Sequence, residues 1–357
     1  MMKVHVVSET AFTTKGNGVH TAFIDLIDLL KEKNDVDVIV NDEGEGDVFH
    51  CHTYGPYYFW KGRRYKGRRI YTAHVIPDSI KGSLPMWKVL MPFVKWYFKK
   101  VYSYADVCIA LSPMVEKAIR DLGVETRIVK IFNPVLIKKW KCTQERRNEG
   151  RKMLGLSDTD FIVLGVGQLE GRKGVEEFLD IAESIPEAKF VWAGGRPFGI
   201  FTEGISRINA RVARNAGQVT FTGMIDIEIM PYVYAASDLL LFPSFQENCP
   251  LAPLEAAACG MPVIFRDIKE YTLLYESSYL SANTTPEFIE LTKRLIHDQS
   301  FYEHGQRISE ELIRQFDKNN IRDKLILLYQ ELIGNSKKRI VVNEVFNTKE
   351  QKIAFVN

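Results

Sequence analysis

Two acidic residues eight positions apart, Glu247 and Glu255, span the passage from an expected loop into an expected helix at about 250–259. Carboxylates placed in this way can accept hydrogen bonds from ligand hydroxyl groups, such as those of a sugar. Asn248 and Cys249 would supply backbone N–H groups at the helix N-terminus, where an anion is favoured. Because an unpaired acid in a small apolar helix would cost several kcal/mol, we expect Glu255 to have a dedicated partner.

A second charged segment, 165–174, carries several glycines and two cations, Arg172 and Lys173, between an apolar strand and a helix. An arginine binds phosphate through two parallel hydrogen bonds and a lysine acts as a point charge. The pair therefore suits a diphosphate. The alternative interpretation is a solvated charged turn.

A glycine pair, Gly16 and Gly18, follows the first expected strand and precedes a helix. Glycines let a backbone approach a ligand closely, and the helix N-terminus favours an anion. By itself such a pair is also typical of an ordinary turn. The spacing is not GxGxxG and no acidic residue follows at the expected place, which argues against a nicotinamide site.

Metal ligands are not expected. Asp158 and Asp160 precede a strand rather than following one, so we interpret them as capping a turn. Three histidines, His20, His50 and His52, have no partner at metal-ligand spacing and are interpreted as structural. The five cysteines lack any CxxC pair, which fits a reducing cytoplasm better than disulfides or zinc.

Charge is distributed very unevenly along the chain. Residues 57–104 contain eleven Lys or Arg and one acid, Asp78, so this window carries +10 and the rest of the chain carries −8 of a total of +2. The window also holds three of the five tryptophans. A basic, aromatic segment indicates a polyanionic partner or an anionic membrane surface.

Membrane contact is predicted for two parts of this window. A helix at about 85–104 would place Lys88, Lys95 and Lys99 on one face, with apolar residues opposite. A loop at 57–69 combines aromatic and basic residues, as proteins do at bilayer interfaces. The alternative is that the helix only covers a sheet, with its lysines in water. The predicted membrane-binding residues are Trp60, Arg63, Arg64, Arg68, Arg69, Trp87, Lys88, Lys95 and Lys99.

The elements that would position these residues are strands alternating with helices. That order predicts an α/β fold with parallel sheets covered on both faces. Two such runs separated near residue 140 indicate two doubly wound domains, 1–140 and 141–334, with the segment 335–357 packing back on the first. Ligands in such folds bind at the carboxyl ends of the strands, here in a cleft between the domains. Expected strands lie at 4–7, 36–40, 48–52, 69–72, 107–111, 128–131, 160–167, 189–193, 219–222, 239–242 and 262–265.

Taken together, the glycine loop, the segment Gly167-Gln168-Leu169 to Lys173-Gly174, and the acids Glu247 and Glu255 resemble the retaining, nucleotide-sugar-dependent glycosyltransferases of family 4, which have the GT-B fold. The resemblance implies that Gly16 and Gly18 approach the donor phosphates and that Arg172 and Lys173 neutralise the leaving diphosphate. Glu247 would hold the donor sugar and Glu255 the ribose.

The resemblance also implies a role for His74, which matches the family's histidine close to the reacting sugar; alone, it would be interpreted as a core histidine. The family usually has Gly-Arg-Leu where this chain has Gln168, which would leave more of the diphosphate charge to Arg172 and Lys173. The predicted donor-binding residues are Gly16, Gly18, Arg172, Lys173, Asn248, Cys249, Pro250, Leu251 and Glu255, with His74 and Glu247 catalytic.

Residues 247–255 and 266–271 are similar to a narrower group, the bacterial glycolipid synthases that extend glucosyl-diacylglycerol. This similarity implies transfer of glucose or galactose from a UDP-sugar to a membrane glycolipid such as α-glucosyl-diacylglycerol, in glycolipid and lipoteichoic-acid anchor synthesis. No metal or other cofactor is expected. The enzyme would be cytoplasmic, peripheral on the inner face of the cell membrane.

Two alternatives remain open from the sequence. One is a GT-B transferase acting on a polysaccharide or other soluble acceptor. The other is a non-enzymatic protein that binds nucleic acid through the basic segment, which would leave Glu247, Glu255 and the Arg172-Lys173 turn without a role. We therefore expect no nucleic-acid partner.

Overall fold

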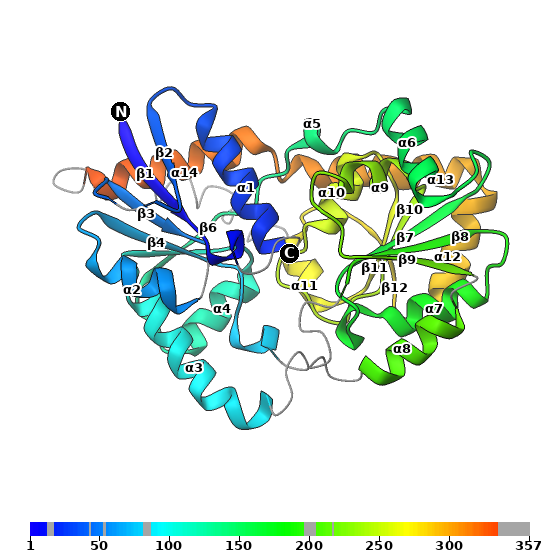
Figure 1. The fold of residues 1–357 in the computed structure, drawn as a ribbon, viewed down its shortest axis with the longest axis horizontal. Coiled ribbons are helices and arrows are strands. Elements are labelled where there is room, and N and C mark those ends of the chain that lie inside the picture. The colour runs from blue at the N-terminus through cyan, green and yellow to red at the C-terminus, as the bar shows by residue number, and fades with distance from the viewer. Residues whose placement is uncertain are drawn as a thin grey trace, which may run out of the picture.

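The structure, a computed structural model, describes residues 1–12, 18–42, 44–52, 55–80, 87–195, 205–215 and 218–334, with the backbone alone at 80, 87, 205–207 and 209. It consists of two α/β halves side by side, each with a parallel sheet between layers of helices (Figure 1). This arrangement confirms the predicted fold class.

The sheet of the first half has six parallel strands in the order β2-β1-β3-β4-β5-β6. The strand order reverses between β1 and β3, which is where ligands bind in such sheets. The strand bounds are Met2–Val7 (β1), Val36–Val40 (β2), Val48–Cys51 (β3), Arg68–Ala73 (β4), Val107–Ala110 (β5) and Arg127–Lys130 (β6).

The sheet of the second half has the order β12-β11-β10-β7-β8-β9, with the reversal between β7 and β10. Of the twelve strands in the part of the chain that the structure describes, eleven fall where the sequence predicts them; the short β12 was not predicted. The bounds are Ile162–Val166 (β7), Lys189–Ala193 (β8), Val219–Gly223 (β9), Leu239–Phe242 (β10), Val263–Arg266 (β11) and Leu280–Ala282 (β12).

Helices cover both faces of each sheet. Those of the first half are η1 (Glu9–Ala11), α1 (Gly18–Lys31), α2 (Pro56–Arg64), η2 (Pro77–Ile80), α3 (Trp87–Ser103) and α4 (Pro113–Asp121). They are followed by α5 (Ile137–Trp140), α6 (Gln144–Leu154), η3 (Gly171–Lys173), α7 (Val175–Glu183), α8 (Ile205–Arg214), α9 (Met230–Ala236), α10 (Ala252–Ala258), α11 (Lys269–Leu274), α12 (Thr285–His297), α13 (Gln299–Arg314) and α14 (Lys318–Ile333).

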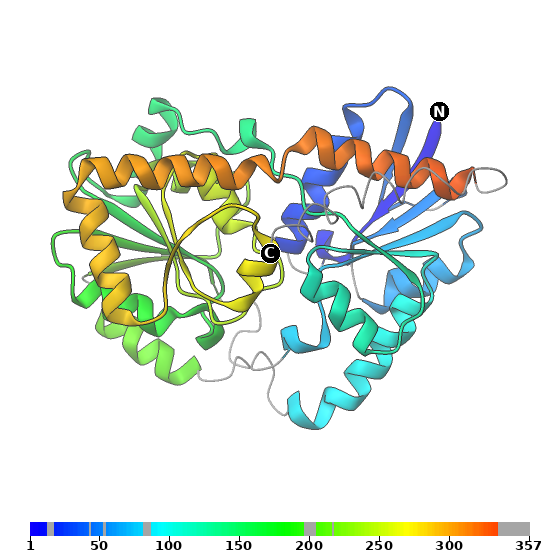
Figure 2. The same cartoon turned by 180° about the vertical axis from the view of Figure 1, so that it is seen from behind.

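The last helix differs from the prediction, which placed residues up to 334 in the second domain. Figure 2 shows α13 and α14 (orange) passing in succession from the second half to the first. The chain thus passes between the halves twice, and the two crossings lie side by side, because Val135 of the first forms a β-bridge with Asp317 of the second. On the first sheet, Arg127 donates to Glu331 at 2.6 Å and Tyr329 bonds His50 at 2.6 Å. The segment 335–357, expected to pack back, lies outside the described residues.

The predicted loop at 57–69 is also corrected, because residues 56–64 form helix α2. Pro56 occupies its first turn, where a missing N–H does no harm. No side chain of the preceding residue caps it, but the Glu9 carboxylate accepts a hydrogen bond from the Tyr58 N–H at 3.0 Å. This cap comes from a distant part of the chain and could not be read from the local sequence.

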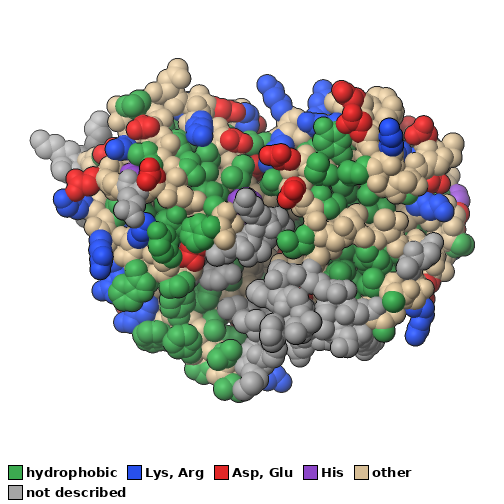
Figure 3. All heavy atoms as spheres, viewed as in Figure 1, with side chains coloured by type: hydrophobic (Ala, Val, Ile, Leu, Met, Phe, Trp, Pro, Cys, Tyr) green, Lys and Arg blue, Asp and Glu red, His purple; other side chains and the backbone are tan. Residues whose placement is uncertain are grey.

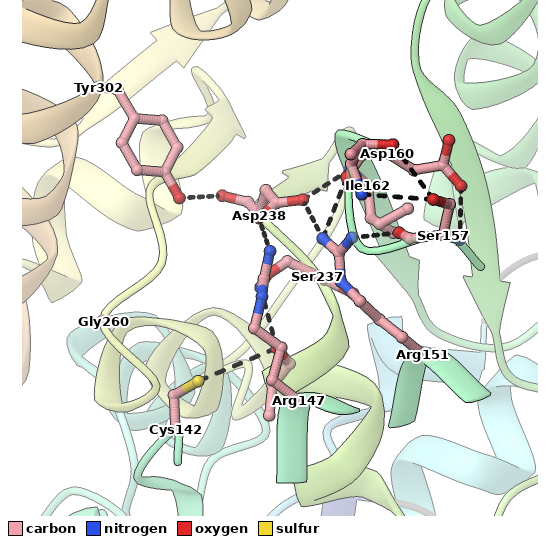
Figure 4. A network of polar contacts seen from close by, with 12 residues as sticks. Cys142, Arg147, Arg151, Ser157, Asp160, Ile162, Ser237, Asp238, Gly260 and Tyr302 are labelled. Atoms are coloured by element: carbon pink, nitrogen blue, oxygen red, sulfur yellow. Dashed lines mark hydrogen bonds and ion pairs between the residues drawn. The ribbon is translucent and has the colours of Figure 1, made fainter. Parts of the chain in front are cut away.

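The polar segment that follows residue 140 contains α6. Its inner face carries Arg151, which is buried and donates to Asp238 at 3.0 Å. Figure 4 shows this guanidinium and that of Arg147 converging on the Asp238 carboxylate. In the same network the Asp160 carboxylate accepts from the Ser157 N–H at 2.8 Å. Asp160 therefore caps a turn, as predicted.

Candidate active site

The predicted donor residues come from two neighbouring strands of the second sheet. Strand β7 leads into η3, which holds Arg172 and Lys173, and β10 leads into the loop that holds Glu247. These two strands pair directly, and parallel strands end at the same edge of a sheet. The two loops are tied together by a hydrogen bond of 2.8 Å from the Phe245 N–H to the Arg172 carbonyl.

Lys173 and Glu247 form an ion pair, with 2.5 Å between the lysine Nζ and the glutamate Oε1. Their side chains are 13% and 8% exposed, so the pair is largely shielded from water. Burial lowers the pKa of Lys173, and the Glu247 carboxylate opposes that shift. The cation and the acid expected to hold neighbouring parts of one ligand therefore lie in contact.

Arg172 is held differently. Its Nε donates to the buried Glu170 carboxylate at 2.8 Å, and the other oxygen of that carboxylate has no partner among the described residues. Glu170 was not singled out from the sequence.

Glu255 has the dedicated partner that the sequence predicted. The Tyr234 hydroxyl, from α9, donates to its Oε2 at 2.6 Å. Burial raises the pKa of Glu255 to about 7, although the Tyr234 hydrogen bond pulls it down. An ion pair between the buried Asp25 of α1 and the half-buried Lys139 of α5, 2.6 Å long, also acts on Glu255 electrostatically. This carboxylate is thus poised to change charge near neutral pH.

The loop that follows β10 also contacts the first half. The Asn248 side-chain amide donates to the Ser79 hydroxyl at 2.9 Å and to the His74 carbonyl at 3.3 Å. Gln246 donates to the Asp78 carbonyl at 3.3 Å. These contacts place His74, at the end of β4, beside the loop that carries Glu247.

His74 lies against a second histidine. Its Nε2 is 2.9 Å from Nδ1 of His52, which follows β3. Burial lowers the pKa of His74 to about 3 and that of His52 well below the ordinary value. Both imidazoles are therefore neutral near pH 7.

The remaining predicted donor residues are only partly described. Gly16 lies outside the described residues, and Gly18 is the first residue of α1. Helix α10 begins at Ala252 rather than 250 and has seven residues, so Asn248 and Cys249 precede it. Burial raises the pKa of the Cys249 thiol to about 12, which makes it unreactive. Pro250 and Leu251 are buried.

The predicted membrane residues divide into two sets. Arg69 is paired with Asp106 at 3.0 Å, and Arg68 donates to the Leu332 carbonyl at 2.9 Å, so both arginines hold the structure together. The others lie on what we call the α2–α3 surface (Figure 3, lower left). Its exposed residues are Tyr57, Trp60, Arg63, Arg64, Lys88, Val89, Leu90, Phe93, Lys95, Trp96, Lys99 and Lys100. The side chain of Trp87 lies outside the described residues.

Helix α3 is buried along one part of its length and exposed along another, and its contact with a membrane stays a prediction. Its C-terminal half covers the sheet with Phe98, Val101 and Tyr102, which are buried. Phe93 and Trp96, nearer its N-terminus, are 63% and 55% exposed to solvent, with their rings 5.7 Å apart. Within the described residues, no helix is long and apolar enough to cross a bilayer, and no group of three potential ligands is placed to hold a metal.

Sequence models of two related families match the two halves. The one described as glycosyltransferase family 4 matches residues 5–138, and the one described as glycosyl transferases group 1 matches residues 160–298. The chain is 36% identical over 272 residues to the alpha-galactosylglucosyldiacylglycerol synthase of Streptococcus pneumoniae (strain ATCC BAA-255 / R6), across 74% of this chain and 72% of that protein. The chain belongs to the family 4 glycosyltransferases, and it is a sugar-transferring enzyme.

Further relatives span nearly the whole chain. The processive diacylglycerol alpha-glucosyltransferase of Acholeplasma laidlawii is 25% identical over 337 residues, 93% of this chain and 99% of that protein. Among solved structures, Anabaena Alr3699/HepE in complex with UDP and glucose superposes with a TM-score of 0.72 at 18% identity, covering 92% of this chain and 99% of that one. Sucrose-phosphate synthase from Thermosynechococcus elongatus gives 0.76 at 19% identity, covering 94% and 100%. The fold is GT-B.

Several residues of the site have no signal in the sequence. Tyr234 and Ser79 reach it from other elements, and His52 was interpreted as structural. Tyr234 and His52 are buried, and Ser79 is bonded to the other half. The partner of each residue is evident only in the folded structure.

Proposed function

We propose that this enzyme transfers a hexose, glucose or galactose, from a UDP-sugar to a membrane glycolipid, with α-glucosyl-diacylglycerol as the acceptor and retention at the anomeric carbon. The observation that carries the proposal is the 36% identity to a synthase named for galactosylglucosyldiacylglycerol. The α2–α3 surface supports it independently.

Donor binding follows from the chemistry of the two loops. Lys173, with Arg172 beside it, would meet the diphosphate, and Glu247 would accept hydrogen bonds from the hexose. Glu255 accepts from the ribose hydroxyls. The leaving diphosphate would be stabilised by cations and backbone N–H groups without a metal, and it would help to deprotonate the acceptor hydroxyl.

UDP binding should release protons near neutral pH, because hydroxyl donation by the ribose favours the charged form of Glu255. The pKa of Glu255, about 7 in the free protein, should fall in the complex, so affinity should decrease as pH drops below 7. Calorimetry in buffers of different ionisation enthalpy measures the released protons. A phosphate also titrates near pH 6, so the Glu255→Gln variant separates the two sources: proton release equal to that of the unaltered enzyme would remove Glu255 from the ribose site.

Docking on an anionic bilayer is proposed for the α2–α3 surface. Arg63, Arg64, Lys95 and Lys99 are exposed there beside Trp60, Phe93 and Trp96. Cations near such a surface contribute about 1 kcal/mol each, and aromatic rings settle at the headgroup level. The enzyme would thus be peripheral on the inner face of the cell membrane, where the glycolipid acceptor lies.

Replacing Arg63, Arg64, Lys95 and Lys99 together by Ser should weaken binding to anionic vesicles at least ~10-fold, since attraction to a charged bilayer acts over about a Debye length. UDP affinity should be unchanged, because the predicted donor residues lie mainly in the second half and none of them belongs to the α2–α3 surface. Co-sedimentation over a salt series measures the effect, and added salt should mimic the substitutions.

The matched control changes four exposed lysines of the second half, Lys152, Lys189, Lys269 and Lys293, to Ser. Equal loss in both variants would show that only net charge matters. Equal sedimentation of the unaltered enzyme with neutral and anionic vesicles would exclude this surface as an anionic-membrane site.

The acceptor class is tested by release of UDP from UDP-hexose with and without vesicles that contain glucosyl-diacylglycerol. Strong stimulation by the glycolipid is expected. Stimulation by a soluble sugar alone would favour a soluble acceptor instead.

A further inference from the structure

Three buried or half-buried histidines, His50, His52 and His74, lie at the carboxyl ends of the adjacent strands β3 and β4. The rings of His50 and His52 lie 4.5 Å apart, and those of His52 and His74 lie 5.0 Å apart. His50 is held by hydroxyls on both sides, Thr72 at 2.7 Å and Tyr329 at 2.6 Å. His52 and His74 instead bond each other.

That bond has only two arrangements. Because both rings are neutral near pH 7, each carries a single N–H. Either Nδ1–H of His52 donates to Nε2 of His74, or Nε2–H of His74 donates to Nδ1 of His52. The first leaves the other nitrogen of His52 without a proton; the second puts a proton on it.

The surroundings of His52 favour the first arrangement. Its Nε2 is buried and has no hydrogen-bond partner among the described residues. A proton there would make an orphaned buried N–H, which native proteins rarely contain. His52 therefore carries its proton on Nδ1 and donates it, so His74 accepts at Nε2 and carries its own proton on Nδ1.

We propose that His52 is a positioning residue, which fixes the ring and the tautomer of His74 so that His74 offers an Nδ1–H donor on the side away from His52. This inference rests on the proposed function, in which His74 lies near the reacting sugar. The Asn248 amide bonded to the His74 carbonyl places the backbone of His74 beside the Glu247 loop. An N–H there suits an oxygen of the hexose or of the departing diphosphate, and His74 acts as a donor rather than a base.

The position of the proton is measured directly by nitrogen NMR of the full-length protein labelled at histidine. A protonated and a bare imidazole nitrogen resonate far apart, so the spectrum identifies the tautomer without any substrate. We expect His74 to be protonated on Nδ1 in the unaltered protein. Protonation on Nε2 would overturn the proposal, whatever the enzyme transfers.

Two variants test the consequence for catalysis. His52→Asn keeps a side-chain N–H close to the position of Nδ1, whereas His52→Leu removes it. We expect kcat to fall about 10- to 100-fold in the Leu variant, as for a slightly misplaced group, with little change in KM for the donor, and the Asn variant to recover most of the loss. Turnover equal to that of the unaltered enzyme in a folded Leu variant would overturn the positioning role.

The control is His50→Gln, which alters the neighbouring ring without touching the bond to His74. It should lower thermal stability and leave the His74 tautomer as it is. If the unaltered protein transfers no hexose from any UDP-sugar, the proposed function fails, and the NMR spectrum still decides where the proton of His74 lies.

Discussion

Glu247→Ala should reduce hexose transfer at least ~100-fold while the protein stays folded. A well-placed polar contact in a closed site contributes on this scale when it acts on the reacting group. The substitution also leaves Lys173 without its 2.5 Å partner, so that cation becomes fully available to a diphosphate. UDP, which has no hexose, should therefore bind as tightly as before or more tightly.

Turnover, thermal melting and UDP calorimetry on the same preparation separate these effects. Glu276→Ala, a change at an exposed acid of the same half, is the matched control and should behave as the unaltered enzyme does. Near-normal turnover in folded Glu247→Ala would remove this residue from the catalytic site. A large loss of UDP affinity would instead assign it to the nucleotide.

Lys173→Met should show the opposite pattern, with UDP affinity reduced about 10- to 100-fold and turnover reduced as well. A charge-assisted hydrogen bond contributes about 1.5–3 kcal/mol, and the product UDP keeps the diphosphate. Arg172→Ala should act in the same direction. Its guanidinium already holds Glu170, so we expect a smaller effect than at Lys173.

Calorimetry with UDP measures both variants against Lys189→Met, which alters an exposed lysine at the start of β8. Unchanged affinity in both Lys173→Met and Arg172→Ala would place the diphosphate elsewhere.

The strands, and the loops after them that carry the site residues, were predictable because they depend on local sequence patterns. Apolar runs marked β7 and β10, and the pairing of these two strands brings Lys173 and Glu247 together, in keeping with the neighbouring roles that the family resemblance implied. The sequence also predicted that Glu255 would have a hydrogen-bond partner, but it did not predict that this partner is Tyr234.

What the sequence did not predict depends on contacts between distant segments. Helix α2 is capped by Glu9 from 49 positions away, and α6 buries an arginine that needs Asp238 from another element. His52 resembled a structural histidine because its partner, 22 positions on, is joined to it only by the pairing of β3 with β4. Arg68 and Arg69 resembled free surface cations until their partners were known.

The most direct test of the proposed function is the lipid product itself. The purified protein is incubated with labelled UDP-glucose or UDP-galactose and vesicles that contain α-glucosyl-diacylglycerol, and the extracted lipid is analysed by mass and by the anomeric configuration of the new linkage. We expect one labelled hexose to be added to the glycolipid in the α configuration from one of the two donors. Release of UDP with no labelled lipid, together with extension of a soluble sugar, would contradict it.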